Sequence, residues 1–176
     1  MLDVHVIISP YTRRDWLDEC LSSIQEARRR AAYAIKVHVA PYHTGHIGKG
    51  RAEGYTLGKY PYVTYVDDDD YLLPSAFDAL DEALLDLPDA IFCAESTLQN
   101  GNLLDGPKRH HLCVYRREHL IDHTQWVVCG DVAQMHAVDG KYCIDISSRN
   151  YVHRIYQSGG RALRRKHHDE LRSARG

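Results

Sequence analysis

The chain has 176 residues, with 22 Lys and Arg against 24 Asp and Glu, and a formal charge of -2. This length suits one domain with a sizeable core. The near-neutral charge argues against general polyanion binding by the whole molecule, although not against a local basic patch. No segment has the length of a membrane span, and the N-terminus lacks a signal-peptide pattern.

The cysteines and histidines indicate the cellular compartment and show whether a histidine metal motif is present. The five cysteines form no C-x-x-C pair and fall mostly within apolar segments, which predicts reduced core residues in a cytoplasmic protein. They are Cys20, Cys93, Cys113, Cys129 and Cys143. The twelve histidines show no metal-ligand spacing, and we expect most of them at the surface.

Strand and helix patterns alternate through the first half of the chain. The predicted strands are residues 4–9, 35–39 and 62–66. The predicted helices are residues 12–30, which begin at a weak capping box of Thr12 and Asp15, residues 49–57, and residues 74–87. Such alternation is typical of a parallel sheet with crossover helices.

The second half is richer in strands. Further strands are predicted at residues 90–94, 112–115, 142–146 and 151–156, the last two as a pair. Asn100 and Gly101 predict a hairpin turn, and short helices are predicted at residues 117–120 and 130–136. The whole pattern predicts an α/β, Rossmann-like three-layer sandwich with a central mixed, mostly parallel sheet.

The strand at residues 62–66 runs directly into four consecutive carboxylates, Asp67 to Asp70, and then to Pro74. Ligands bind at the carboxyl ends of the strands in open α/β sheets. Four adjacent like charges need a counter-charge, and Mg²⁺ or Mn²⁺ prefers hard oxygen ligands. The stretch therefore predicts a divalent metal site. The alternative is a solvated acidic loop that caps the next helix.

Residues 50–74 resemble family 2 glycosyltransferases of the GT-A fold. That family has an A-R-N-x-G helix, an apolar strand, and an acidic D-x-D-D followed by a proline. Arg51 and Gly54 match this pattern, and Ala52 replaces the asparagine. Looser similarity covers residues 8–13, 114–118, 130–131 and 151–154. The resemblance implies a small, single-domain enzyme over residues 1–160, and virus-encoded enzymes are one expected type. Residues 161–176 are expected to form a basic, helical tail.

The resemblance implies a metal-dependent, inverting glycosyltransferase. Such an enzyme moves a hexosyl or pentosyl group from a nucleoside-diphosphate sugar, expected to be a UDP-sugar, to an acceptor hydroxyl. Two positions depart from the family. No carboxylate follows the second strand, so Tyr42 is expected to stack on the donor base, and Gly130 replaces the glutamate of an E-D pair.

The predicted site combines metal ligands, donor contacts and a general base. Asp69 is the predicted metal ligand and Asp67 a ligand of the metal or the ribose, with Asp68 and Asp70 as alternatives. His153 is a candidate third ligand, or an ordinary strand residue. Asp131 is the candidate base, or an aspartate favoured by the helix dipole. The expected donor contacts are Pro10, Tyr11, Thr12, Arg13, Tyr42, Arg51, Asp67 and Asp68.

Two other functions remain open at this point. A nucleotidyltransferase has a similar sheet and acidic site, although the glycine-rich signature that it carries after the first strand is absent here. A non-catalytic nucleotide-sugar-binding module would be favoured by loss of Asp131 or of the acidic run, and both are present. The expected acceptor is a protein side chain, a metabolite or a hydroxylated base in DNA. The basic tail would hold DNA phosphates or form a solvated helix.

Overall fold

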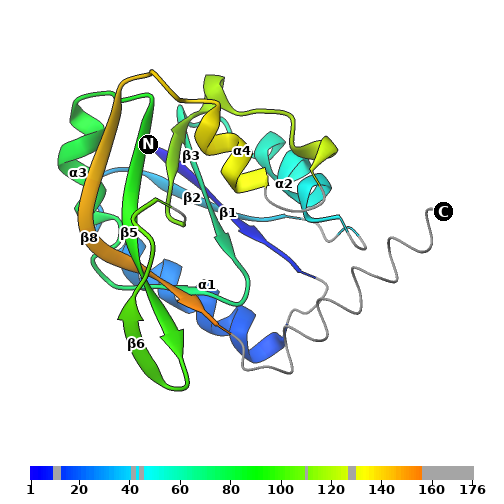
Figure 1. Cartoon of the computed structure of the whole chain (residues 1–176), viewed down its shortest axis with the longest axis vertical. Helices are drawn as coiled ribbons and strands as arrows, with labels where there is room; N and C mark the ends of the chain where they lie inside the picture. Colours follow the sequence, from blue (N-terminus) through cyan, green and yellow to red (C-terminus); the bar gives the residue numbers. More distant parts are fainter. Residues whose placement is uncertain (10–12, 41–42, 44–45, 110, 127–129, 156–176) are drawn as a thin grey trace.

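The computed structural model describes residues 1–9, 13–40, 43, 46–109, 111–126 and 130–155. Its strands form one sheet in the order β2-β1-β3-β7-β5-β8-β4, with β6 paired to β5 (Figure 1). The strands are β1 (Leu2–Ile7), β2 (Ile35–Val39), β3 (Tyr62–Asp67), β4 (Tyr71–Leu72), β5 (Ala90–Gln99), β6 (Asn102–Asp105), β7 (Val114–Arg116) and β8 (Cys143–Arg154). The helices are α1 (Arg14–Arg28), α2 (Ile47–Thr56), α3 (Asp78–Leu85) and α4 (Gly130–His136), with short 3₁₀ helices η1 (Arg117–His119) and η2 (His123–Gln125).

The sheet is mixed, and its longest pairings are parallel. β1 pairs in parallel with β2 and β3, and β5 pairs in parallel with β8. β7 runs antiparallel between β3 and β5, while β4 and β6 are antiparallel additions to β8 and β5. These directions bring the carboxyl ends of β1, β3, β5 and β8 to one edge. Ligands bind at that edge in open α/β sheets.

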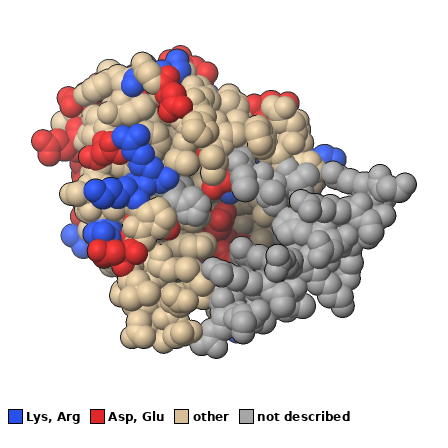
Figure 2. Space-filling model, in the orientation of Figure 1, with Lys and Arg blue, Asp and Glu red and all other residues tan. Residues whose placement is uncertain are grey.

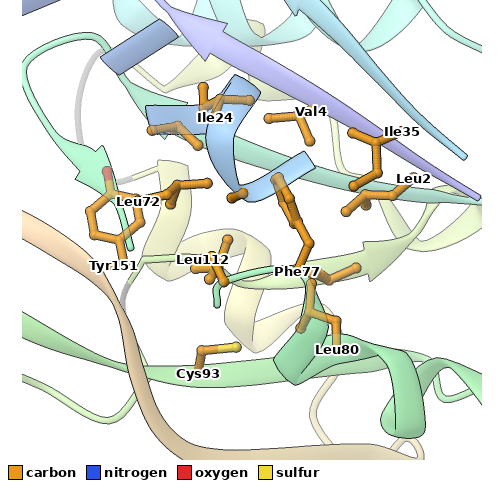
Figure 3. Close-up of a cluster of buried hydrophobic side chains, with 14 of the residues drawn as sticks. Leu2, Val4, Ile24, Ile35, Leu72, Phe77, Leu80, Cys93, Leu112 and Tyr151 are labelled. Carbon is orange, nitrogen blue, oxygen red and sulfur yellow. The ribbon is translucent and has the colours of Figure 1, made fainter. Parts of the chain in front are cut away.

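Each face of the sheet is covered by helices, so the molecule has the predicted three layers. Side chains alternate between the faces of a strand. On one face, Leu2 and Val4 of β1 join Ile24 of α1 and Leu80 of α3 in a fully buried cluster, which Figure 3 shows in close-up. The opposite face packs Ile7 of β1 against α2, and it packs β5 against α4.

Local signals predicted most of these elements. β2 and α4 have the predicted bounds, and Asn100 and Gly101 form the predicted hairpin turn, both with positive φ (54° and 78°). Gly54 packs closely against the loop after β2, because a Cβ at this position would lie 3.0 Å from the Cβ of Ala40. The described cysteines are free, and Cys20, Cys93 and Cys113 are buried, whereas Cys129 lies outside the described residues.

Three predictions about elements were wrong. The expected pair of strands at residues 142–146 and 151–156 is the single strand β8, which follows β5 through register shifts between Cys93 and Glu95. Helix α3 begins at Asp78, because residues 74–77 form a turn before it. The N-cap of α1 is Arg13, which makes no side-chain capping bond.

Some predictions fall on residues that the structure does not describe. The tail at residues 161–176 is among them, so the predicted terminal helix stays a prediction. Within the described part of the chain, the helices lack the combination of length and apolar character that a membrane crossing requires.

Candidate active site

The four consecutive aspartates lie at the carboxyl end of β3, where Asp67 ends the strand half-buried and the other three form a buried turn. Asp68, Asp69 and Asp70 are at most 5% exposed. The Asp70 N–H donates to the Asp67 carbonyl at 3.1 Å, and the Ser9 N–H at the end of β1 donates to Oδ2 of Asp68 at 3.2 Å. Figure 2 shows an acidic floor at the bottom of a hollow in this region. A solvated acidic loop is therefore excluded, because these carboxylates are enclosed by neighbouring strands.

Asp70 fixes the end of β8 to this turn. Its Oδ2 accepts a hydrogen bond from the Tyr151 hydroxyl at 2.7 Å and lies 3.0 Å from Nδ1 of His153, and its Oδ1 accepts from the Arg154 N–H at 2.8 Å. The Tyr151 oxygen also accepts from the Asp67 N–H at 3.2 Å. Asp70 therefore sets the position of the whole acidic turn relative to β8.

Asp67 lies between two cationic groups. Its Oδ1 is 3.6 Å from Nη2 of Arg51, and its Oδ2 is 3.6 Å from Nε2 of His111. Burial alone would raise the pKa of Asp67, but His111 and Arg51 outweigh burial and hold it below its usual range. Asp67 is therefore an anion whose two oxygens already have positive neighbours.

Arg51 brings the predicted base into this group. Its guanidinium is buried, lies 4.3 Å from the centre of the Tyr65 ring, and approaches Oδ1 of Asp131 to 3.7 Å through Nη1. The side chain of Asp131 is 14% exposed. Residues on α2, β3 and α4 that the sequence singled out separately thus meet at one edge of the sheet. Figure 1 shows α2 and α4 next to each other.

Sequence reasoning missed the pair of His111 and Glu95. Nδ1 of His111 is 2.6 Å from Oε2 of Glu95, both side chains are buried, and the imidazole stacks on Tyr151 and His153 with ring centres 4.6 and 4.7 Å away. Burial lowers the pKa of His111, but Asp67 and Glu95 outweigh it and raise that pKa to about 10. His111 is therefore a buried imidazolium between two carboxylates.

A weak signal for this pair exists in the sequence. Glu95 continues the apolar run of residues 90–94, and a carboxylate inside a buried strand needs a partner. The expectation that most histidines lie at the surface was wrong for His5, His111 and His123, which are at most 3% exposed.

Solved structures of TarS from S. aureus share this arrangement of strands and helices. TarS 1–349 in complex with UDP gives a TM-score of 0.64 at 15% identity, over 87% of this chain and 60% of that chain. The complex of TarS 1–349 with UDP-GlcNAc gives 0.62 at 14% identity, over 89% and 59%. These are glycosyltransferases of GT-A type. The chain has a GT-A fold.

This chain matches only part of the length of the TarS structures. This chain spans about three fifths of TarS 1–349, and it spans 36% of the longer TarS structure. No protein-family model matches the chain, and no curated protein does. At these identities the likeness shows the fold, and the chemistry has to be argued from the residues of this chain.

Two groups at this end of the GT-A fold could hold a metal ion. Asp67, Asp69 and Asp70 offer carboxylate oxygens within 4.8 Å of one another, and Asp70, His111 and His153 form a second set, in which His111 would have to release its proton to bind a metal. The predicted ligands Asp67, Asp69 and His153 are thus divided between two groups that share Asp70. The all-carboxylate group fits Mg²⁺ or Mn²⁺, which prefer hard oxygen ligands.

The remaining predicted donor residues are only partly described. Arg13 lies before α1, where its guanidinium pairs with Asp15 at 2.6 Å and lies 4.3 Å from the centre of the Trp16 ring. Pro10, Tyr11, Thr12 and Tyr42 lie outside the described residues. Arg51 faces Asp67 and Asp131, so its charge is directed at these two carboxylates.

Proposed function

We propose that this protein is a metal-dependent, inverting glycosyltransferase that uses a nucleoside-diphosphate sugar, in the first place a UDP-sugar, and acts in the cytoplasm. The observation that carries the proposal is the buried acidic turn at the carboxyl end of β3, with Asp131 opposite it across Arg51. The complexes of TarS 1–349 with UDP and UDP-GlcNAc support this donor class.

Asp69 and Asp67 would hold Mn²⁺ or Mg²⁺, with Asp70 as the neighbouring carboxylate and His153 as a further candidate. Such an ion, when bound, would neutralise charge on the diphosphate that leaves. Asp68 and Asp67 would also position the donor. Asp70 would keep the turn in place through its bonds to Tyr151 and Arg154.

Asp131 would act as the general base. Its carboxylate would accept the proton of the acceptor hydroxyl while that oxygen forms a bond to the anomeric carbon. The bond from this carbon to the diphosphate oxygen would break in the same step, and a single displacement of this kind inverts the anomeric centre. Arg51 would orient Asp131, because its buried guanidinium lies 3.7 Å from Oδ1.

A thermal-shift screen tests the donor class directly, because a ligand that binds the native state raises its melting temperature. UDP, GDP, UDP-sugars and nucleoside triphosphates are each added with and without Mn²⁺. We expect stabilisation by UDP and UDP-sugars that depends on the ion, followed by transfer or release of the sugar. Stabilisation by triphosphates with release of pyrophosphate would instead identify a nucleotidyltransferase.

A further inference from the structure

A basic pocket lies on the sheet beside the acidic turn. It has a volume of about 780 Å³, and its lining includes Ala94 of β5, Asp145 and Arg149 of β8, and Lys108 and Arg109 of the loop before β7, so that three cations face one carboxylate. Figure 2 shows Lys and Arg side chains gathered over β5 and β8, next to the acidic hollow. A pocket of this size can enclose a small molecule or part of a larger one.

Two strands lead from this pocket into the candidate active site. On β5, Ala94 lines the pocket and the next residue, Glu95, contacts His111. On β8, Arg149 lines the pocket, and Tyr151 binds Asp70 two residues later. With a rise of about 3.3 Å per strand residue, Arg149 lies about 7 Å along β8 from Tyr151, the residue that binds Asp70.

The pocket is also linked to the helix that carries the candidate base. The guanidinium of Arg109 lies 4.8 Å from the centre of the Phe92 ring. Phe92 belongs to the apolar cluster against which Met135 of α4 packs. The same helix carries Asp131. A ligand anchored in the pocket would therefore lie close to both the acidic turn and α4.

The charges of the pocket suit an anion. Arg109 makes a bidentate pair with Asp145, and Nη2 of Arg149 lies 3.0 Å from Asp105, whose side chain is 82% exposed. Exposed pairs of this kind contribute little to stability and can exchange for a ligand. Within the described part of the chain, Nε of Arg149 is buried without a hydrogen-bond partner, and Lys108 is exposed without a carboxylate partner.

We propose that this pocket is the acceptor subsite and binds a phosphate group of the acceptor, an inference that rests on the proposed function. The guanidinium forks of Arg109 and Arg149 match phosphate oxygens, and Lys108 adds a third cation. The donor diphosphate belongs at the acidic turn with its metal ion. A phosphate beside Arg149 is therefore that of the molecule whose hydroxyl reacts. A phosphorylated small molecule and a nucleic acid strand offer the same chemistry.

A binding experiment without nucleotide and without divalent ions tests the pocket alone. Isotope-labelled protein is titrated with glycerol 3-phosphate, with glycerol as the neutral control, and with an oligothymidylate, while the arginine Nε–H signals are followed by NMR. We expect the signals of Arg109 and Arg149 to shift with the two phosphate ligands and not with glycerol. The tighter of the two ligands identifies the source of the phosphate.

Matched variants decide whether the pocket is responsible. Arg149→Gln and Lys108→Gln should each weaken binding about tenfold, the effect of one charge-assisted hydrogen bond. Arg28→Gln on α1 and Lys36→Gln on β2 remove the same charges from exposed positions outside the pocket and should leave binding unchanged. Equal weakening by pocket and control variants, or equal shifts with glycerol, would overturn the proposal.

Measurements of turnover test the acceptor subsite and the proposed glycosyltransferase activity independently. With phosphorylated acceptors, Arg149→Gln should raise the acceptor KM about tenfold and leave kcat unchanged. Phosphate binding in the pocket without any sugar transfer would refute the glycosyltransferase and keep the anion site. Sugar transfer whose acceptor KM is the same in Arg149→Gln and in the wild type would keep the enzyme and refute the subsite.

Discussion

Arg51 and Asp131 form an ion pair of 3.7 Å between helices α2 and α4, and this pair places the candidate base opposite the acidic turn. The same guanidinium lies 3.6 Å from Asp67. Because Arg51 is buried and packed on Tyr65, it has little freedom to move. One side chain thus sets the positions of the donor-side and the acceptor-side carboxylates relative to each other.

The Asp131→Asn variant tests the base. An amide cannot accept the hydroxyl proton, so kcat should fall about 10²-fold or more, the usual scale for general base catalysis. Donor affinity, measured by calorimetry, should stay within a few-fold of the wild type. Asp139→Asn, at an exposed position just after α4, is the control and should behave like the wild type. Lost donor binding with an unchanged kcat would give Asp131 a different role.

Removal of the metal tests the acidic turn. EDTA should abolish donor binding, and Asp69→Asn should abolish turnover while the metal-free protein keeps or gains stability, because the substitution removes one of four crowded charges. Melting temperatures with and without Mn²⁺ and the donor measure binding and stability, and a sugar-transfer assay measures turnover. Asp18→Asn, on the exposed face of α1, should remain fully active. Undiminished activity in EDTA would contradict the metal site.

The Glu95→Gln variant tests the pair that the sequence did not reveal. The substitution removes the nearer of the two carboxylates beside the buried His111 and leaves Asp67 at 3.6 Å, so we expect a loss of about 1.5–3 kcal/mol of unfolding free energy, the scale of a hydrogen bond to a charged group. A double-mutant cycle with His111→Gln measures the coupling, and the double variant should lose less than the sum of the single losses. Additive losses in chemical denaturation would show that the two side chains do not depend on each other.

Asp3 is a further buried carboxylate, on the face of β1 under α2. It accepts hydrogen bonds from the Tyr60 N–H at 2.8 Å and from Nη2 of Arg117 at 2.6 Å, and it lies 2.8 Å from Nε2 of His38. Asp3→Ala should destabilise the fold by about 3–5 kcal/mol, because Arg117 loses its partner. Asp18→Ala removes an exposed pair and should change urea denaturation by about 0.5 kcal/mol or less.

The burial of His5 leads us to expect that the protein loses stability in acid. It is fully buried beside Asp3, His38, Tyr55 and Arg117, and burial together with the nearby His38 lowers its pKa to about 3. The unfolded chain takes up this proton near the ordinary histidine pKa of 6.5, while the folded protein does not. The contribution of neutral, buried His5 to the free energy of unfolding is therefore fully present above about pH 6.5. It decreases as the pH falls from 6.5 toward about 3.

A variant isolates this contribution from the other titrating groups. His5→Phe should reduce the slope of unfolding free energy against pH by about 1.4 kcal/mol per unit between about pH 6 and pH 4. The slope is the readout, since the larger ring also changes packing. His136→Phe alters an exposed histidine and should keep the wild-type slope. An unchanged slope in His5→Phe would show that His5 is protonated in the folded state.

The sequence by itself determined the features that depend on neighbours along the chain. Alternation of apolar residues predicted β2, and the helix-start pattern at Gly130 and Asp131 predicted α4. The acidic run placed the candidate site at the end of β3, because a strand and the turn that follows it are contiguous. The GT-A fold followed from the order of such local segments and from the motif at residues 50–74.

Only the tertiary structure decided which side chains meet. Glu95 and His111 are 16 positions apart, and Asp70 is 81 positions from Tyr151, so their contacts depend on how the sheet brings β5 beside the segment before β7, and β8 beside the turn after β3. The face that Glu95 occupies depends in turn on how β5 and β8 align. That alignment contains register shifts beside Glu95, and a shift of one residue moves a side chain to the other face of a sheet. Local pattern carries no information about such a shift. The charges of Arg51, Asp67 and Asp131 likewise became one group only when α2, β3 and α4 packed together, because ion pairing acts through space and not along the chain.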